Sequence, residues 1–169
     1  MNDNDQSTGT ELYFIRHAHA GSAEQWTGAD ELRPLSDKGI GQAERLGVHL
    51  ALVGFSPDVI LSSPKLRALQ TAEIVAAALG KQVKVDGRLA EEVELSDLDA
   101  IVRDTGPARR PVLVGHDPDF SQLVTDLTGA REIALKKGAL ARIDVFGEIA
   151  PVGGTLRWLL PPDLVPRAD

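Results

Sequence analysis

Short apolar runs alternate with longer amphipathic stretches along most of this chain. Four of the runs have the length of strands and lie at residues 12–15, 58–61, 83–85 and 111–114. The first of them is uninterrupted, which is typical of a strand that is covered on both faces of a sheet. Two more runs follow each other directly near the end of the chain, at residues 139–145 and 155–160.

The stretches between the first strands carry apolar residues at helical spacing. Ser36 is a suitable N-cap for a helix whose apolar stripe ends before Gly54. The next helix is predicted to take Ser63 as its N-cap, with Pro64 at the first helical position, and to stop at Gly80. Two helices are therefore expected in the first half of the chain.

The second half continues the alternation and defines the fold class. Residues 95–102 predict a short helix, and Asp117-Pro118 predicts the start of another one that ends at Gly129. Strands that alternate with helices predict an α/β protein, a three-layer α/β/α sandwich with a mostly parallel central sheet. Because no helix separates the last two strands, we expect them to form an antiparallel pair at one edge.

The length of 169 residues suits one domain with a sizeable core, which we expect to span residues 11–165. Residues 1–10 are polar and lack the hydrophobic run of a secretory signal, so they predict a disordered tail. No apolar stretch is long enough to cross a bilayer, so no membrane partner is expected. We expect a cytoplasmic protein, and the absence of cysteine is compatible with that compartment.

The formal net charge of −7 argues against a nucleic-acid partner, because nucleic-acid binding is dominated by positive patches on phosphates. A pocket for a phosphorylated ligand must then be a local feature on an otherwise acidic surface. The lack of cysteine also excludes disulfides and thiolate metal sites.

Three predicted strands end in residues that suit phosphate chemistry. Arg16 and His17 close the first strand, His116 closes the run 112–115, and Arg67 lies in the first turn of the helix after Pro64. Ligand sites of α/β sheets form where strand carboxyl ends meet helix amino ends, so we expect these side chains to share one site. Alone, each residue would more often be an interior histidine or an exposed arginine; it is the combination that indicates a phosphoryl-transfer site.

The chemistry assigns a role to each residue. A neutral His17 imidazole can attack phosphorus and form a covalent phosphohistidine that water later cleaves. Arg16 and Arg67 can fork onto phosphoryl oxygens, neutralise charge in the loose transition state, and lower the pKa of His17. His116 is expected to donate a hydrogen bond to another phosphoryl oxygen or to share the charge.

A zinc site is a rival interpretation, because His17 and His19 form a His-x-His pair. The positive charge of Arg16 beside them opposes a dication, so we expect no metal, and His19 is expected at the pocket rim or in solvent. Residues 19–34 form a long polar loop, in which Trp26 could cover the site or anchor the loop. Lys136 and Lys137 could attract an anionic substrate, although an exposed pair is the simpler interpretation.

The chain resembles the histidine phosphatase (phosphoglycerate mutase-like) superfamily from about residue 12 to residue 164. The motifs that carry the resemblance are Ile15-Arg16-His17-Ala18, Ser62-Ser63-Pro64-Lys65-Leu66-Arg67-Ala68-Leu69-Gln70-Thr71-Ala72 and Val114-Gly115-His116. Smaller features are similar to SixA-type phosphohistidine phosphatases: Arg33-Pro34-Leu35-Ser36, Lys137-Gly138-Ala139 and Trp158-Leu159-Leu160-Pro161-Pro162.

The resemblance implies that His17 is the phosphorylated residue, that Arg16, Arg67 and His116 form its pocket, and that catalysis needs no metal or other cofactor. Family members commonly have glycine after this histidine, whereas this chain has Ala18, which should be tolerated unless the position needs a positive φ.

Many relatives place a carboxylic acid in the pocket to protonate the leaving group. Glu91 stands at about the matching place, although Glu92 and Glu94 leave the register open, and a solvated acidic turn is an equally good interpretation.

These features together predict a phosphatase that releases inorganic phosphate, with phosphohistidine on a protein as the preferred substrate. Little sequence separates the main elements, so a large cap over the pocket is not expected, and an open pocket suits a protein-borne phosphate. Two alternatives remain: a phosphatase or mutase for a small phosphorylated metabolite, and a phosphate-recognising module without turnover.

Overall fold

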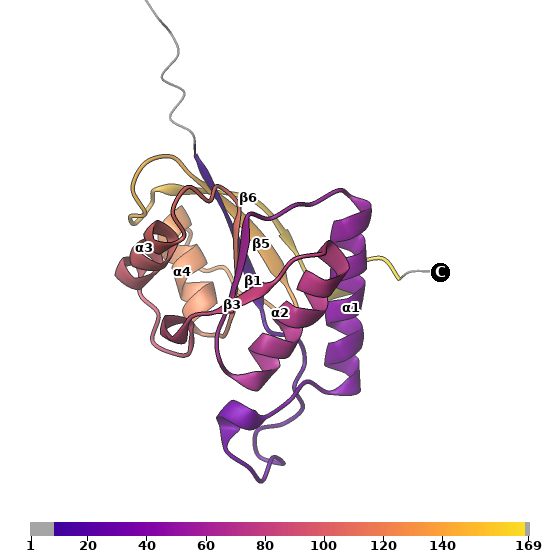
Figure 1. The fold of residues 1–169 in the computed structure, drawn as a ribbon. Coiled ribbons are helices and arrows are strands. Elements are labelled where there is room, and N and C mark those ends of the chain that lie inside the picture. The colour runs from indigo at the N-terminus through magenta and orange to yellow at the C-terminus, as the bar shows by residue number, and fades with distance from the viewer. Residues whose placement is uncertain (1–8, 168–169) are drawn as a thin grey trace, which may run out of the picture.

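The computed structural model describes residues 9–167, so most of the predicted polar tail lies outside the described residues. Six strands form one sheet in the order β3-β2-β4-β1-β5-β6 (Figure 1). Their bounds are β1 Thr10–Arg16, β2 Val59–Ser62, β3 Val83–Val85, β4 Pro111–Gly115, β5 Leu140–Val145 and β6 Gly154–Leu160. All six predicted strands are present, and β1 begins at Thr10, the last residue of the predicted tail.

Helices cover both faces of the sheet, as the predicted three-layer sandwich requires. Helices α1 and α2 lie on one face, and α3 and α4 lie on the other (Figure 1). Their bounds are α1 Asp37–Leu52, α2 Leu66–Leu79, α3 Leu95–Asp104 and α4 Asp119–Thr128, with short 3-10 helices η1 Asp30–Leu32, η2 Gly87–Leu89 and η3 Pro162–Leu164. In the described part of the chain, no helix combines the length and apolarity needed to span a membrane.

Strand β1 shows why an uninterrupted apolar run is needed at the centre of the sheet. Successive side chains of a strand point to opposite faces. Leu12 and Phe14 therefore pack in the core beneath α3 and α4, whereas Tyr13 and Ile15 pack in the core beneath α1 and α2. All four side chains are buried, because both faces of this strand are covered.

The sheet is mixed in the predicted way. Strands β3, β2, β4 and β1 run parallel to one another, whereas β5 runs antiparallel to both β1 and β6. The antiparallel pair β5-β6 lies at one edge, which confirms the prediction drawn from the missing helix between these strands. The carboxyl ends of β1, β2 and β4 consequently meet at one edge of the sheet.

One predicted helix start is confirmed and one is wrong. Ser36 caps α1, because its Oγ accepts a hydrogen bond from the Gly39 amide at 3.2 Å. Ser63 does not cap α2, which begins two residues after Pro64, at Leu66. The Ser63 hydroxyl accepts from the Lys65 amide at 3.2 Å in a turn that precedes the helix.

The start predicted at Asp117-Pro118 is also displaced. Helix α4 begins at Asp119, and Pro118 is the residue that precedes it. The Asp117 carboxylate accepts hydrogen bonds from the amide and the hydroxyl of Ser121, at 3.2 and 2.8 Å. The predicted ends at Gly80 and Gly129 are confirmed, since both glycines are left-handed C-cap residues.

Candidate active site

The two histidines of the candidate site lie at the ends of neighbouring strands. Arg16 on β1 is in register with Gly115 on β4, and the His17 amide donates to the Gly115 carbonyl at 2.9 Å. This register places His17 level with His116, and their ring centroids are 5.2 Å apart. The structure thus brings together two residues that are far apart in the sequence.

The ring of His17 has a defined tautomer. Its Nδ1 lies 2.7 Å from the carbonyl oxygen of Ala18. Because a carbonyl only accepts hydrogen bonds, Nδ1 carries the proton and Nε2 presents its lone pair. Burial is the main cause that lowers the pKa of His17 to about 3; the charges of Arg67 and Arg16 act in the same direction, and the hydrogen bond to Ala18 opposes them. The imidazole is therefore neutral near pH 7, as a nucleophile must be.

The alanine after the candidate nucleophile fits without strain. Ala18 is completely buried, and its amide donates to the Thr71 hydroxyl on α2 at 3.1 Å. Among the described residues, the only non-glycine residues with positive φ are Glu92 and Val152. Position 18 therefore does not need glycine, and the segment after β1 is attached to α2 through its backbone.

His116 is held by the residue that was expected to cap α2. Its Nε2 lies 2.7 Å from the Ser63 hydroxyl oxygen, and only 7% of the residue is exposed. This oxygen also accepts from the Lys65 amide; in the tautomer in which the hydroxyl donates to Nε2, Nδ1 carries the ring proton. Burial lowers the pKa of His116 to about 3, and the charges of His17 and Arg67 act in the same direction.

Arg67 reaches the site from the first turn of α2 and is held by the loop before α1. Its Nη1 donates to the Asp30 carbonyl at 2.7 Å, and its Nη2 donates to the Asp30 carboxylate at 2.9 Å. Arg33 Nε pairs with the same carboxylate at 2.9 Å. Burial lowers the pKa of Arg67, and the Asp30 charge opposes that shift.

Arg16 is fixed from the opposite side of the site. Its Nη1 donates to the Leu135 carbonyl at 2.6 Å and pairs with the Asp117 carboxylate at 3.0 Å. The Asp117 carboxylate thus contacts both Arg16 and Ser121 in the first turn of α4, which explains why this helix begins later than predicted.

Unpartnered nitrogen atoms are concentrated in this site. Between residues 9 and 167, three buried side-chain polar atoms lack a hydrogen-bond partner: Arg16 Nε, Arg67 Nε and His116 Nδ1. A buried donor without a partner costs about 1–3 kcal/mol, so such atoms are rare unless a ligand satisfies them. All three belong to residues that the sequence predicts to bind phosphate.

Glu91 lies at the margin of this group. Its side chain is 76% exposed, and its carboxylate is 3.6 Å from Lys65 Nζ. The charge of Lys65 in turn acts on the pKa of His116. The role of Glu91 as a proton donor stays a prediction.

His19 is occupied by contacts of its own. Its Nδ1 lies 2.7 Å from the Ser36 hydroxyl, and the described residues contain no group of three or more side chains placed to hold a metal ion. Trp26 is 38% exposed and donates to the Ala29 carbonyl at 2.9 Å, so it stabilises its own loop.

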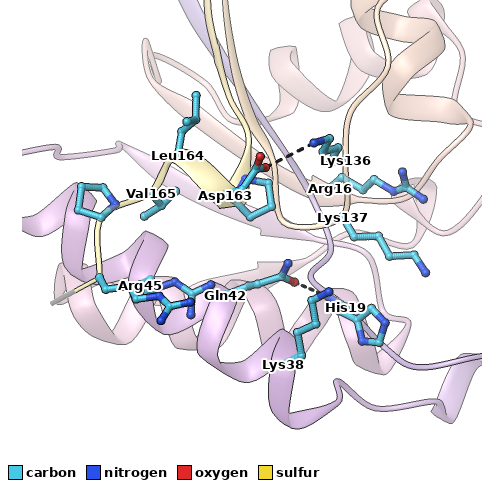
Figure 2. A pocket seen from close by; sticks show the side chains of 13 residues that line it. Arg16, His19, Lys38, Gln42, Arg45, Lys136, Lys137, Asp163, Leu164 and Val165 are labelled. Atoms are coloured by element: carbon cyan, nitrogen blue, oxygen red, sulfur yellow. Dashed lines mark hydrogen bonds and ion pairs between the residues drawn. The ribbon is translucent and has the colours of Figure 1, made fainter.

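A groove of about 920 Å³ extends from Arg16 and His19 across one side of the site (Figure 2). Its walls are the amino-terminal half of α1, the turn before β5 and the segment after β6, and its lining residues are Arg16, His19, Lys38, Gln42, Arg45, Lys136, Lys137, Pro162, Asp163, Leu164, Val165, Pro166 and Arg167. His17, Arg67 and His116 do not line it. The groove is therefore a neighbour of the phosphate site and distinct from it.

The family is shown by comparison with known proteins. Residues 12–117 match the Histidine phosphatase superfamily (branch 1), and this chain belongs to that family. Its fold is that of phosphoglycerate mutase-like proteins, and it is a phosphatase of this superfamily.

Similar proteins extend the match over almost the whole chain. An uncharacterized protein of Picosynechococcus sp. is 35% identical over 171 residues, which cover 89% of this chain and 99% of that protein. The SixA structure from Agrobacterium tumefaciens is similar with a TM-score of 0.76 and 23% identity, covering 90% of this chain and 98% of that one. A structure of the protein histidine phosphatase SixA with tungstate has a TM-score of 0.78 and 22% identity, covering 91% of this chain and 98% of that chain. At these identities the two structures establish the fold.

Sequence reasoning missed the residues that hold the site. Asp30 stands in a polar loop without periodicity, so nothing in the sequence connects it with Arg67. Ser63 and Asp117 carried a signal that was assigned to helix capping, although each follows a strand that ends at the site. A polar residue that directly follows a buried strand can therefore hold a residue of the site instead of capping a helix.

Proposed function

We propose that this phosphatase hydrolyses phosphohistidine on a protein through a covalent phosphohistidine intermediate at His17. The observation that carries the proposal is the set of three unpartnered nitrogen atoms beside a neutral, buried His17. An oxyanion between them would satisfy all three atoms, and preorganised donors of this kind are effective in phosphoryl transfer.

In the proposed reaction, the Nε2 atom of His17 attacks phosphorus while the bond from phosphorus to the leaving nitrogen breaks. Arg16 and Arg67 neutralise the equatorial oxygens, and His116 donates a hydrogen bond to one of them. The leaving imidazole takes a proton, for which Glu91 is the proposed donor. Water then cleaves the phosphohistidine, which frees His17 and releases inorganic phosphate.

The assignment of phosphohistidine as substrate is supported by the resemblance to SixA proteins in motifs and in fold. The short connections between elements also support it, because an uncapped site can receive a phosphate on a large partner. A small phosphoester is the alternative substrate, since the groove has the volume of a small-molecule pocket.

Trapping of the intermediate tests the proposal. The protein is mixed with a phosphohistidine peptide labelled in the phosphoryl group, quenched rapidly, and the label is mapped. We expect label on His17 and release of phosphate without added metal. The variant His17→Ala should lose turnover by a factor of at least about 10³, because nucleophile and intermediate are both removed.

The matched control is His49→Ala, which removes a histidine of α1 outside the site and should retain wild-type rates. Label on a different residue would contradict the mechanism. Turnover of sugar phosphates but of no phosphohistidine peptide would assign the small-molecule alternative. Ligand binding that survives His17→Ala, in a wild-type protein without turnover, would indicate a recognition module.

A further inference from the structure

The groove beside the site is strongly basic, although the protein as a whole is acidic. Its lining residues include one carboxylate, Asp163, and six cationic side chains, namely Arg16, Lys38, Arg45, Lys136, Lys137 and Arg167. The complete chain has a formal net charge of −7. Positive charge is therefore gathered on this one concave surface, which suits an anionic ligand.

The cations are distributed along the groove. Lys38, Gln42 and Arg45 recur at the spacing of one helical face, so all three side chains of α1 line the same wall (Figure 2). At a rise of about 1.5 Å per residue, the seven steps along α1 from Lys38 to Arg45 span roughly 10 Å. A single phosphate group is too small to contact both ends, whereas a ligand with several anionic groups along its length could contact all of these cations.

These cations have few partners of their own. In the part of the chain that the structure describes, Lys136 pairs with Asp163 at 3.5 Å, and no ion pair includes Lys38, Arg45 or Lys137. Burial lowers the pKa of Lys137, and the charges of Arg16 and other neighbouring cations lower it further. An anionic ligand would offset this mutual repulsion.

The groove is connected with the phosphate site by position and by charge. Arg16 belongs to both, since it carries an unpartnered Nε in the site and also lines the groove. The charge of Lys137 contributes to the low pKa of His17. A ligand in the groove would therefore lie next to the group that is transferred.

We propose that the groove binds an acidic segment of the protein substrate adjacent to its phosphorylated residue. This inference rests on the proposed function and adds a substrate class, phosphoproteins with clustered carboxylates beside the phosphorylated side chain. An extended segment of about three residues spans the 10 Å between Lys38 and Arg45. Pro162, Leu164, Val165 and Pro166 supply apolar contacts for a polypeptide.

Two phosphohistidine peptides of equal length test the proposal, one with glutamates beside the phosphorylated histidine and one with glutamines. The wild-type protein should show a kcat/KM at least about tenfold higher for the acidic peptide, mainly through KM, and high salt should reduce the difference. The double variant Lys38→Glu/Arg45→Glu should abolish this preference. Equal kcat/KM values for both peptides in the wild-type protein would overturn the inference.

The matched control for the single variant Lys38→Glu is Lys84→Glu, the same charge change on β3 at the opposite edge of the sheet, which should retain the preference. If the double variant fails to fold, Lys38→Glu alone serves, because Lys38 is exposed in the first turn of α1, where a carboxylate is favourable. A preference that persists in the folded Lys38→Glu variant, or one that is lost equally in Lys38→Glu and Lys84→Glu, would exclude the groove.

A binding measurement separates failure of this inference from failure of the proposed function. Fluorescence anisotropy with the unphosphorylated acidic peptide reports on the groove without turnover, and roughly tenfold weaker binding is expected for the double variant. Absence of turnover on both phosphopeptides would overturn the proposed function, while the anisotropy would still decide the groove. Groove-dependent turnover of a small polyphosphorylated molecule, without peptide binding, would replace the protein segment by that molecule.

Discussion

The buried imidazoles of His17 and His116 make the free energy of unfolding of the protein depend on pH. Both have a pKa of about 3 in the folded protein, whereas an ordinary histidine has a value of 6.5. The unfolded chain therefore binds protons first as the pH falls, and the free energy of unfolding decreases between pH 6.5 and pH 3. At pH 5 the loss is about 2 kcal/mol for each histidine, at about 1.4 kcal/mol per pKa unit.

We expect the variants His17→Gln and His116→Gln to lose less stability than the wild-type protein between pH 6.5 and pH 5. Each variant removes one buried group that must be protonated on unfolding, so its stability curve should be flatter by about 2 kcal/mol over this range. Urea denaturation at a series of pH values measures the difference. Parallel curves for variants and wild type would show that burial does not lower the pKa of these two histidines.

At the residue scale, the sequence predicted which residues meet and not how they are held. His17 and His116 could be placed together because both follow buried strands, and strand ends share an edge. The partner of Arg67 could not be predicted, because Asp30 reaches it from a loop of exposed residues without periodicity. The role of Glu91 depends on an irregular segment with a positive φ at Glu92, and such backbone is not encoded by a simple pattern.

At the scale of elements, helix α1 fixes the segment that follows the candidate nucleophile. The Ser36 amide donates to the His19 carbonyl at 3.0 Å, and Gln42 accepts from the His19 amide at 2.9 Å. Gly39 allows this close approach, because a Cβ at position 39 would overlap the His19 carbonyl oxygen.

Gly39→Ala should therefore destabilise the protein by about 1–3 kcal/mol and reduce phosphatase activity, because the segment after His17 must shift. Gly41→Ala on the same helix is the matched control, since its Cβ would meet only Arg45 Nη1 at 3.4 Å. That variant should be stabilised by about 0.5–1 kcal/mol, as alanine is the better helix former. Thermal unfolding measures the stability of both variants, and phosphate release measures their activity. Similar effects of the two substitutions would contradict the packing argument.

The elements themselves were largely predictable, because strand length, helical periodicity and glycine stops are local signals. The starts of α2 and α4 were misplaced because a Ser or Asp before proline was assigned to capping. In the folded chain the polar groups of Ser63 and Asp117 contact His116 and Arg16. Contacts with residues distant in the sequence thus outweighed the local preference of Ser63 and Asp117 for helix capping.

At the scale of the whole molecule, the groove was beyond sequence analysis. It joins the end of β1, the face of α1, the turn before β5 and the segment after β6. Lys136 and Lys137 could be noticed as a pair, whereas Lys38, which lines the same groove, precedes them by almost 100 residues in the chain. The formal net charge does not reveal this surface, because the total charge of the chain is negative whereas the groove is basic.

The central position of β1 has a consequence for the dynamics of the protein. This strand is paired with β4 on one side and β5 on the other, whereas residues 22–32, which include Asp30, are exposed. Hydrogen–deuterium exchange should thus be slowest for amides of β1 and fast for most amides of 22–32, since paired backbone opens only in large unfolding events. Uniform exchange rates across both segments would contradict this. On this expectation the candidate nucleophile directly follows the most persistent strand of the domain, so that opening of the segment that holds Arg67 would leave His17 in place.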